Sequence, residues 1–207
     1  LVKIPRRALL VIDVQNEYFD GHLPIEYPDP NASLANMVDA ATAAHGAGVP
    51  VVLVQNIAPP GTPIFAAGSH GAELHPRAAA LPHALLVQKA LPSAFAGTRL
   101  QAWLIGQGVT TLTVAGFMTH NCVDATVREA VHAGFDVEVL ADATGSVPYA
   151  NRAGRASAKT IHETFLTVMQ SRFANVLTTA QWVSALGGEP LPARESIYSS
   201  NQAARAR

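Results

Sequence analysis

The sequence predicts a doubly wound α/β fold, a three-layer α/β/α sandwich built on a mostly parallel six-stranded sheet. Short, nearly continuous apolar runs alternate along the chain with segments of helical periodicity. Uninterrupted apolar runs of this kind are typical of parallel strands that are buried on both faces. Because each parallel crossover is right-handed and packs its helix onto the sheet, the alternation favours helices on both sides of it.

Six apolar runs are expected to form the strands of this sheet. They cover residues 8–14, 49–55, 84–88, 110–115, 135–140 and 175–177. Helical patterns, in which apolar side chains recur every three or four positions, occupy residues 31–41, 100–104, 123–130 and 161–169. The resulting order of strands and helices is that of repeated βαβ units.

At 207 residues the chain is long enough for one sizeable core, and we expect a single domain over residues 1–207. Residues 57–82 form a long segment rich in Pro, Gly, Ala and His between two expected strands. Long loops in compact domains are usually functional, so this loop is expected to cover the site. The tail, residues 187–207, lacks helical periodicity and is expected to be an arm or to be disordered.

Composition narrows the class of partner. The net charge is −1 and like charges do not cluster, so neither a nucleic-acid footprint nor an electrostatic membrane anchor is predicted. No apolar run approaches the length of a membrane span, and no signal-peptide pattern follows the first residues. The single cysteine fits a reducing compartment, and we expect a cytoplasmic location and small-molecule partners.

Three reactive side chains fall where expected strands end. Asp13, Lys89 and Cys122 follow the first, third and fourth apolar runs, and parallel strands bring their carboxyl ends to one edge of the sheet. A thiol at the start of a helix meets free N–H groups, which favours its thiolate. Each residue alone has an ordinary alternative: a turn carboxylate, a solvated lysine and a buried apolar cysteine. Together they supply a base, a cation and a sulfur nucleophile.

Three segments of the chain resemble the isochorismatase-like cysteine hydrolases. They are residues 11–16 (VIDVQN), 89–95 (KALPSAF) and 116–130 (GFMTHNCVDATVREA). The resemblance implies a catalytic triad of Asp13, Lys89 and Cys122 in a three-layer α/β sandwich. It also implies hydrolysis of an amide, ureide or related C–N bond in a small molecule by a homo-oligomer such as a dimer or tetramer. We expect no cofactor.

The same resemblance implies how the negative charge on the substrate oxygen is stabilised. The backbone N–H groups of Met118 and Cys122 would form the oxyanion hole, with a cis peptide between Phe117 and Met118. In the chemistry that these residue types suggest, Asp13 accepts the thiol proton, and Lys89 holds the resulting charges together.

Some relatives bind a metal through an Asp-x-His pair after the second strand, where this chain has Asn56 and Ala58. We therefore predict no metal. His70 and His75 remain in the loop without an obvious carboxylate partner, which is more typical of structural or surface histidines.

Several residues near the predicted site are candidates for shaping its walls. Glu73 is interpreted as either part of the site wall or a solvated loop carboxylate. Arg128 is expected to form a structural ion pair. Five residues are candidates for the substrate pocket by their position, although aromatic residues more often pack in cores. They are Phe19, Phe65, Phe95, Phe117 and His120.

Four functions compete on this evidence. A cysteine amidohydrolase is favoured over a vinyl-ether hydrolase like true isochorismatase, because the latter kind of relative needs no thiol nucleophile. An intact set of Asp13, Lys89 and Cys122 argues against a non-catalytic binding or assembly protein on the same scaffold. A thiol redox protein is disfavoured because no second cysteine is present to resolve an oxidised Cys122.

Overall fold

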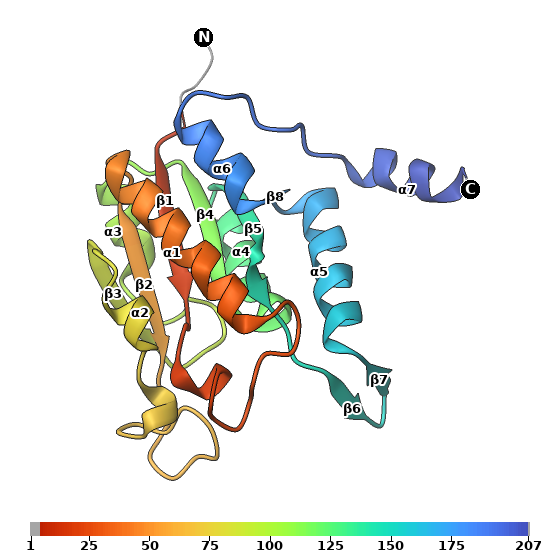
Figure 1. Cartoon of the computed structure of the whole chain (residues 1–207). Helices are drawn as coiled ribbons and strands as arrows, with labels where there is room; N and C mark the ends of the chain where they lie inside the picture. The colour runs from red at the N-terminus through yellow and green to blue at the C-terminus, as the bar shows by residue number, and fades with distance from the viewer. Residues whose placement is uncertain (1–4, 207) are drawn as a thin grey trace.

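The computed structural model describes residues 5–206, and at its centre lies a sheet of six parallel strands (Figure 1). The strands lie in the order β3-β2-β1-β4-β5-β8, so the direction of winding reverses between β1 and β4. Their bounds are β1 (Arg7–Ile12), β2 (Val51–Asn56), β3 (Leu85–Lys89), β4 (Thr111–Phe117), β5 (Asp136–Gly145) and β8 (Asn175–Leu177). The predicted doubly wound fold is confirmed.

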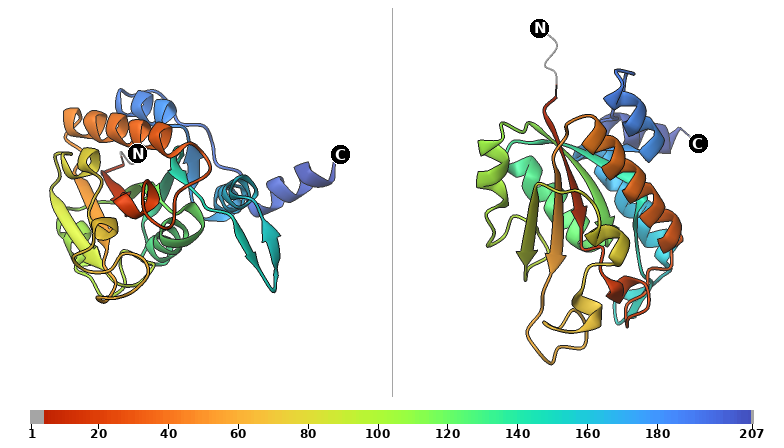
Figure 2. Two further views of the ribbon diagram at one scale, coloured as in Figure 1. Left: turned by 60° about the horizontal axis from the view of Figure 1, so that its bottom comes forward. Right: turned by 60° about the vertical axis from the view of Figure 1, so that its left-hand side comes forward.

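Helices cover both faces of the sheet and complete the three layers (Figure 2). One face packs against α1 (Pro30–Gly46), α2 (Pro76–Ala79) and α6 (Thr179–Leu186). The other packs against α3 (Leu100–Gly106), α4 (Asp124–His132) and α5 (Ala158–Arg172). In the described residues no helix is both long enough and apolar enough to cross a membrane.

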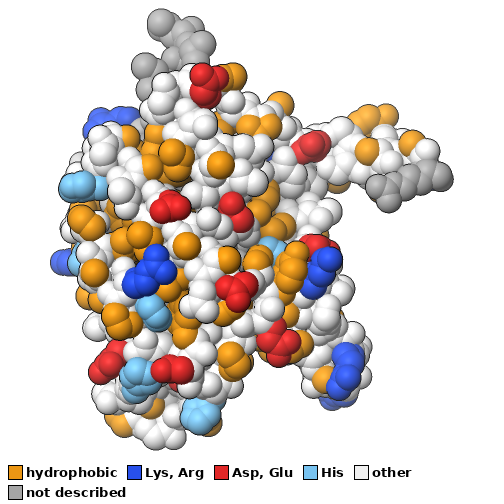
Figure 3. All heavy atoms as spheres, viewed as in Figure 1, with side chains coloured by type: hydrophobic (Ala, Val, Ile, Leu, Met, Phe, Trp, Pro, Cys, Tyr) orange, Lys and Arg blue, Asp and Glu red, His pale blue; other side chains and the backbone are white. Residues whose placement is uncertain are grey.

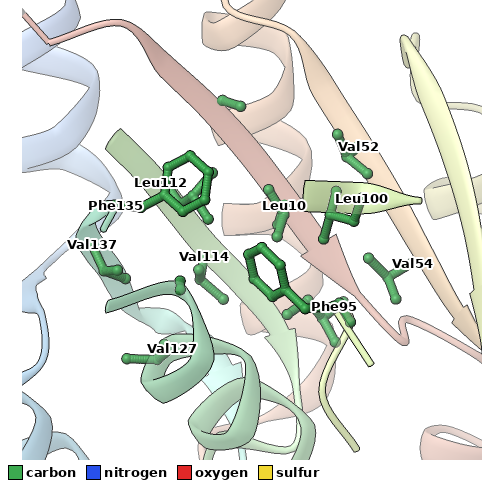
Figure 4. Packing of buried hydrophobic residues seen from close by; sticks show 14 of the residues in the cluster. Leu10, Val52, Val54, Phe95, Leu100, Leu112, Val114, Val127, Phe135 and Val137 are labelled. Atoms are coloured by element: carbon green, nitrogen blue, oxygen red, sulfur yellow. The ribbon is translucent and has the colours of Figure 1, made fainter. Parts of the chain in front are cut away.

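The alternation of side chains along β1 explains why both faces need cover. Leu10 and Ile12 point to one face and Leu9 and Val11 to the other, and all four are at most 1% exposed. Figure 4 shows Leu10 packed among Val52, Leu112 and other apolar side chains of the first face. Burying one such side chain contributes about 1.5–3 kcal/mol to the stability of the folded protein. The two cores therefore hold in place the strands whose ends carry the site.

Polar side chains fix where the helices begin. The Asp29 carboxylate accepts a hydrogen bond from the Ala32 N–H at 2.9 Å, and Pro30 occupies the first helical position of α1. The Ser157 side chain caps α5 in the same way. At α6 the Thr178 and Gln181 side chains form a reciprocal capping box.

Some elements were not predicted. The long segment from residue 57 to residue 82 is not a plain loop, because it contains the short helices η2 (His70–Ala72) and α2. An antiparallel hairpin of β6 (Tyr149–Asn151) and β7 (Gly154–Ala156) projects from the molecule (Figure 1). The tail forms an extended arm, as one alternative expected, but it also contains a helix, α7 (Ile197–Arg205), that contacts α5.

A buried ionic network holds the sheet together away from the ends of the strands that carry the candidate site. Glu138 on β5 receives hydrogen bonds from Arg7 Nη2 at 2.9 Å, Thr113 Oγ1 at 2.8 Å and Trp182 Nε1 at 2.9 Å. The Arg7 and Glu138 side chains are only 12% and 7% exposed. Since every partner of this carboxylate comes from a different element, it ties β1, β4, β5 and α6 to one another.

We predict that Glu138→Ala lowers the free energy of unfolding by about 3 kcal/mol, because it leaves the Arg7 charge buried without its partner. Urea unfolding measures the change. The matched control is Glu163→Ala, which removes an exposed carboxylate 3.8 Å from Lys159 and should cost less than about 1 kcal/mol. Equal losses in the two variants would contradict the structural role of the network.

Candidate functional site

The candidate site lies at the carboxyl ends of β1, β2, β3 and β4. Asp13 directly follows β1 and has a left-handed backbone conformation, with φ of 51°. Lys89 is the last residue of β3. Cys122 lies in η3 (Thr119–Val123), a π-helical turn between β4 and α4. The sheet therefore brings together three residues that are separated by up to 109 positions in the sequence.

Close approach of β1 and β4 at the switch point requires a glycine. Gly116 has a φ of +111°, and a Cβ built there would lie 2.0 Å from the Ile12 carbonyl oxygen. The register between β4 and β5 also shifts between Val114 and Gly116. A side chain at this position would push β4 away from β1, and with it the turn that carries Cys122.

Lys89 lies at the centre of the cluster. Its Nζ is 2.7 Å from Asp13 Oδ2, 3.2 Å from Cys122 Sγ and 3.4 Å from Asn56 Oδ1. The side chains of Lys89 and Asp13 are both 0% exposed. The three N–H donors of the ammonium group thus face three different acceptors, so Lys89 has no donor left for a further partner.

Burial sets the protonation of this cluster. Burial raises the pKa of Asp13, although the Lys89 ammonium beside it opposes the shift. Burial lowers the pKa of Lys89, but attraction to Asp13 and Cys122 outweighs it and holds the pKa above its usual value. The expected resting state is a carboxylate paired with an ammonium.

Cys122 is a neutral thiol in the resting protein. Its pKa is raised to about 12, first by burial and then by the negative charge of Asp13, and Lys89 only partly offsets these effects. The expectation of a thiolate at a helix N-terminus is therefore wrong for this state. The physical reason is that the buried turn removes water from the sulfur, and the carboxylate repels a second negative charge.

The Asp13 carboxylate is placed to accept a proton. Beyond the 2.7 Å ion pair with Lys89, neither of its oxygens receives a well-directed hydrogen bond from the described residues. Buried carboxylate oxygens normally accept hydrogen bonds, so leaving these two without a well-directed donor destabilises the folded protein. A base that must take up the thiol proton needs such a free acceptor.

Two polar residues that the sequence analysis did not assign to the site support Lys89. Asn56 ends β2 and contacts the ammonium through its side chain. Gln15 holds Asn56 in place, since its amide donates to the Asn56 carbonyl at 2.8 Å and accepts from the Asn56 N–H at 2.9 Å. It also donates to the Ala72 carbonyl at 2.7 Å, which ties the loop to the site. Gln15 lies within the recognised segment 11–16, and Asn56 stands at the metal-motif position after the second strand, so position was the available signal.

The turn that carries the thiol is tightly held. The Phe117–Met118 peptide bond is cis. The Met118 carbonyl accepts hydrogen bonds from the N–H groups of Asn121 at 3.0 Å and Val123 at 3.2 Å. These bonds close the turn around the sulfur and fix the backbone of residues 118–123.

A cavity of about 390 Å³ opens onto Cys122. One wall comes from residues 58–65 of the long loop, and another from residues 90–92 after β3. Tyr18, Leu23, Asn56, Met118 and Asn121 complete the lining. A cavity of this size suits a small molecule. A larger hollow of about 570 Å³ lies at the opposite, amino ends of the strands, among Arg7, His45, Pro50 and Val109, away from the thiol.

Only Phe65 among the five predicted pocket residues lines this cavity. Phe117 is 0% exposed and packs edge-on against Tyr18, with ring centroids 5.4 Å apart. Phe19 packs at a tilt against His75, with ring centroids 4.4 Å apart, and edge-on against Phe117 at 5.9 Å. Neither ring lies in the cavity lining, because both pack in the apolar layer that supports the cavity.

Phe95 and His120 also lie outside the cavity lining. Phe95 points into the core on the α3 and α4 side of the sheet, near Leu100 and Val54 in Figure 4. His120 hydrogen-bonds to Ser146 Oγ and Tyr149 Oη, both at 3.0 Å. Burial lowers the pKa of His120 to about 4, so it is a neutral structural group between the turn and the hairpin.

The loop histidines have partners that the sequence did not reveal. His70 Nε2 lies 3.1 Å from both carboxylate oxygens of Asp20, and its Nδ1 lies 3.7 Å from Glu73 Oε2. Figure 3 shows histidine and acidic side chains gathered at this end of the molecule. These side chains are about two-thirds exposed, and Glu73 does not line the cavity. Within residues 5–206, no cluster of three His, Cys, Asp or Glu side chains could hold a metal ion.

Arg128 forms the structural ion pair that was expected. Its Nε lies 2.8 Å from Asp124 Oδ2, one turn earlier on α4, and its guanidinium lies 4.3 Å from the centre of the Phe173 ring. These contacts join α4 to the segment after α5.

A thiol, an ammonium and a carboxylate buried together at the switch point of a parallel sandwich define a class of α/β protein equipped for nucleophilic hydrolysis. Residues 7–181 match the isochorismatase domain, so the chain belongs to the isochorismatase family and is a hydrolase. The resemblance of its three motifs to this family is confirmed.

Three similar proteins illustrate the match. A solved structure of a putative isochorismatase from Burkholderia xenovorans LB400 is 60% identical, with a TM-score of 0.97 and 99% of each chain covered. The uncharacterized isochorismatase family protein YddQ of Bacillus subtilis is 33% identical over 83% of this chain and 96% of its own. The ureidoacrylate amidohydrolase RutB of Methylobacterium radiotolerans is 30% identical over 86% of this chain and 79% of its own.

We predict opposite changes in thiol reactivity when the two charged neighbours of Cys122 are removed. Asp13→Asn removes the charge that raises the pKa of Cys122, so iodoacetamide should alkylate the native protein about 10-fold faster or more near neutral pH. Lys89→Met removes the charge that lowers this pKa, so alkylation should slow. Mass spectrometry reads the rate directly, because Cys122 is the only cysteine.

The control for the lysine variant is Lys159→Met, which removes an exposed lysine that lies outside the site and should leave the rate unchanged. Changes in the same direction for Asp13→Asn and Lys89→Met would contradict the electrostatic account of the cluster.

Proposed function

We propose that this protein is a cysteine-dependent amidohydrolase that cleaves an amide or related C–N bond of a small molecule through a thioester intermediate. The observation that carries this proposal is the position of Lys89 Nζ, 2.7 Å from the Asp13 carboxylate and 3.2 Å from Cys122 Sγ, beside a small-molecule cavity. Relationship to an amidohydrolase such as RutB supports the choice of a C–N bond.

Acylation begins with a neutral thiol, because the pKa of Cys122 is raised to about 12. As the sulfur attacks the substrate carbonyl carbon, its proton passes to the Asp13 carboxylate. The buried environment that raises the pKa of Asp13 makes this carboxylate a stronger base. Lys89 stays positively charged throughout, and it stabilises first the carboxylate and then the developing negative charge on sulfur.

The tetrahedral intermediate carries its negative charge on the former carbonyl oxygen. The backbone N–H groups of Met118 and Cys122 are the proposed donors to this oxygen. Met118 and Cys122 both line the cavity, and the closed turn between them keeps the backbone preorganised. Fixed donors of this kind stabilise the charge without reorganisation during the reaction.

The intermediate collapses when the C–N bond breaks and the protonated Asp13 gives its proton to the leaving nitrogen. A water molecule then attacks the thioester, while the Asp13 carboxylate takes one of its protons. The C–S bond then breaks and releases the carboxylic acid product, and the proton on Asp13 passes to sulfur to restore the neutral thiol.

The placement of the thiol favours this reaction over the alternatives. A vinyl-ether hydrolase needs no sulfur nucleophile, yet here the sulfur lies on the cavity lining and contacts an ammonium at 3.2 Å. A non-catalytic scaffold would not need a thiol placed 3.2 Å from the ammonium of a buried ion pair. A cytoplasmic location and a homo-oligomeric assembly stay predictions from the sequence.

We predict that Cys122→Ala lowers turnover by about 10⁴-fold or more while the thermal unfolding midpoint changes little. The assay is ammonia release from a panel of small amides, ureides and imides, with intact-protein mass spectrometry to trap an acyl adduct on the wild type. Undiminished hydrolysis by the purified variant would rule out the thioester route.

Lys89→Met and Asp13→Asn should both lower kcat/KM by at least about 100-fold, although they shift thiol alkylation in opposite directions. Turnover needs the base and the cation together, whereas alkylation needs only the thiolate. Wild-type activity in Asp13→Asn would show that the carboxylate is not the base.

Activity should survive exhaustive chelation, since Asn56 and Ala58 stand where metal-binding relatives have Asp and His. Turnover is compared before and after dialysis against EDTA. Loss of activity that zinc, iron or manganese restores would overturn this prediction and direct attention to His70.

A further inference from the structure

The cavity beside Cys122 has an uncharged lining. Fourteen residues line it, and none is an Asp, Glu, Lys, Arg or His. Nine of them are apolar, among them Leu23, Ile64, Phe65 and Leu91. The remaining polar groups are neutral amide, hydroxyl and thiol side chains. A ligand that fills this space therefore meets apolar surface and a few neutral polar atoms.

The ionisable groups of the lining are held in their neutral forms. Burial raises the pKa of Tyr18 well above its usual value, and the negative charge of Asp13 acts in the same direction. The same effects keep the Cys122 thiol protonated. Tyr18 is 1% exposed and lines the cavity, so its neutral hydroxyl is a hydrogen-bonding group for a ligand.

The nearest positive charge is unavailable to a ligand. Lys89 is paired with Asp13 at 2.7 Å, and its side chain is 0% exposed. The carboxylate of Asp13 repels any second anion brought close to the sulfur. Other ionisable side chains at this end of the molecule are His70, Asp20 and Glu73. They lie outside the lining, and two of them are carboxylates.

We infer that the substrate is an uncharged amide with a largely apolar acyl group, and that amides bearing a carboxylate are excluded. This inference rests on the proposed function and names the substrate class of the same site. Burying a carboxylate in an apolar cavity without a counter-charge is strongly unfavourable, whereas an alkyl group gains from the same contacts. Preference for a neutral acyl group separates this chain from a relative such as RutB, whose name gives ureidoacrylate as its substrate.

A matched pair of probes tests the inference. Succinamate and 4-methylpentanamide have nearly the same shape, but the second carries an isopropyl group where the first carries a carboxylate. The wild type should hydrolyse 4-methylpentanamide with a kcat/KM at least about 100-fold higher than for succinamate. A preference for succinamate would overturn the inference and would mean that a cation from elsewhere, such as a second copy of the chain, completes the site.

Binding to the inactive protein separates this inference from the proposed function. Cys122→Ala should give ligand-observed NMR signals for 4-methylpentanamide, with succinamate binding at least about 10-fold more weakly. Selective binding of the neutral probe supports the inference even if the wild type hydrolyses neither compound. In that case the proposed function fails, and the inference about the ligand stands. Equal or stronger binding of succinamate contradicts the inference even if hydrolysis of other amides succeeds.

A charge added to the lining should reverse the preference. Ile64→Arg places a guanidinium in the loop wall of the cavity, and it should shift the ratio of kcat/KM values toward succinamate by about 10-fold or more. Ile105→Arg makes the same substitution at a 61% exposed position on α3 and should leave the ratio unchanged. An equal shift of the kcat/KM ratio in both variants, or no shift in either, would show that the uncharged lining does not set the preference between the two probes.

Discussion

The ion pair between Lys89 and Asp13 is the interaction on which the candidate site depends. At 2.7 Å and an effective dielectric near 20, the attraction is about 6 kcal/mol before desolvation, and it must offset the burial of two charges with 0% exposed side chains. Each charge is tolerated only because the other is present. The pair therefore fixes the position of the ammonium beside Cys122 and keeps a carboxylate in the core.

The sheet supplies the geometry that this pair requires. Asp13 and Lys89 belong to strands that are not neighbours, since β2 lies between β1 and β3. Lys89 therefore spans the end of β2, where Asn56 accepts its third contact and Gln15 holds the Asn56 backbone. On the other side of β1, Gly116 allows β4 to approach closely enough for the Cys122 turn to reach the ammonium.

Much of this arrangement could be predicted from the sequence. Apolar runs located all six strands, and strand ends located Asp13, Lys89 and Cys122, because both follow from a local pattern in the chain. The residues that line the pocket could not be predicted to the same extent. Phe95 and Phe117 are as apolar as Phe65, and which aromatic ring faces a cavity depends on packing between distant segments. The hairpin β6–β7 and helix α7 carry no long apolar stripe, so periodicity gave no signal for them.

The same burial that strengthens the ion pair also explains the protonation of the thiol. A site dry enough to hold Lys89 against Asp13 raises the pKa of Cys122 to about 12, so the nucleophile is stored as a thiol and ionises only as its proton moves to the base. A dry site also penalises any unpaired charge on a ligand. Because Lys89 is paired with Asp13 in this buried site, the neutrality that we propose for the substrate and the neutrality of the resting thiol have one physical origin.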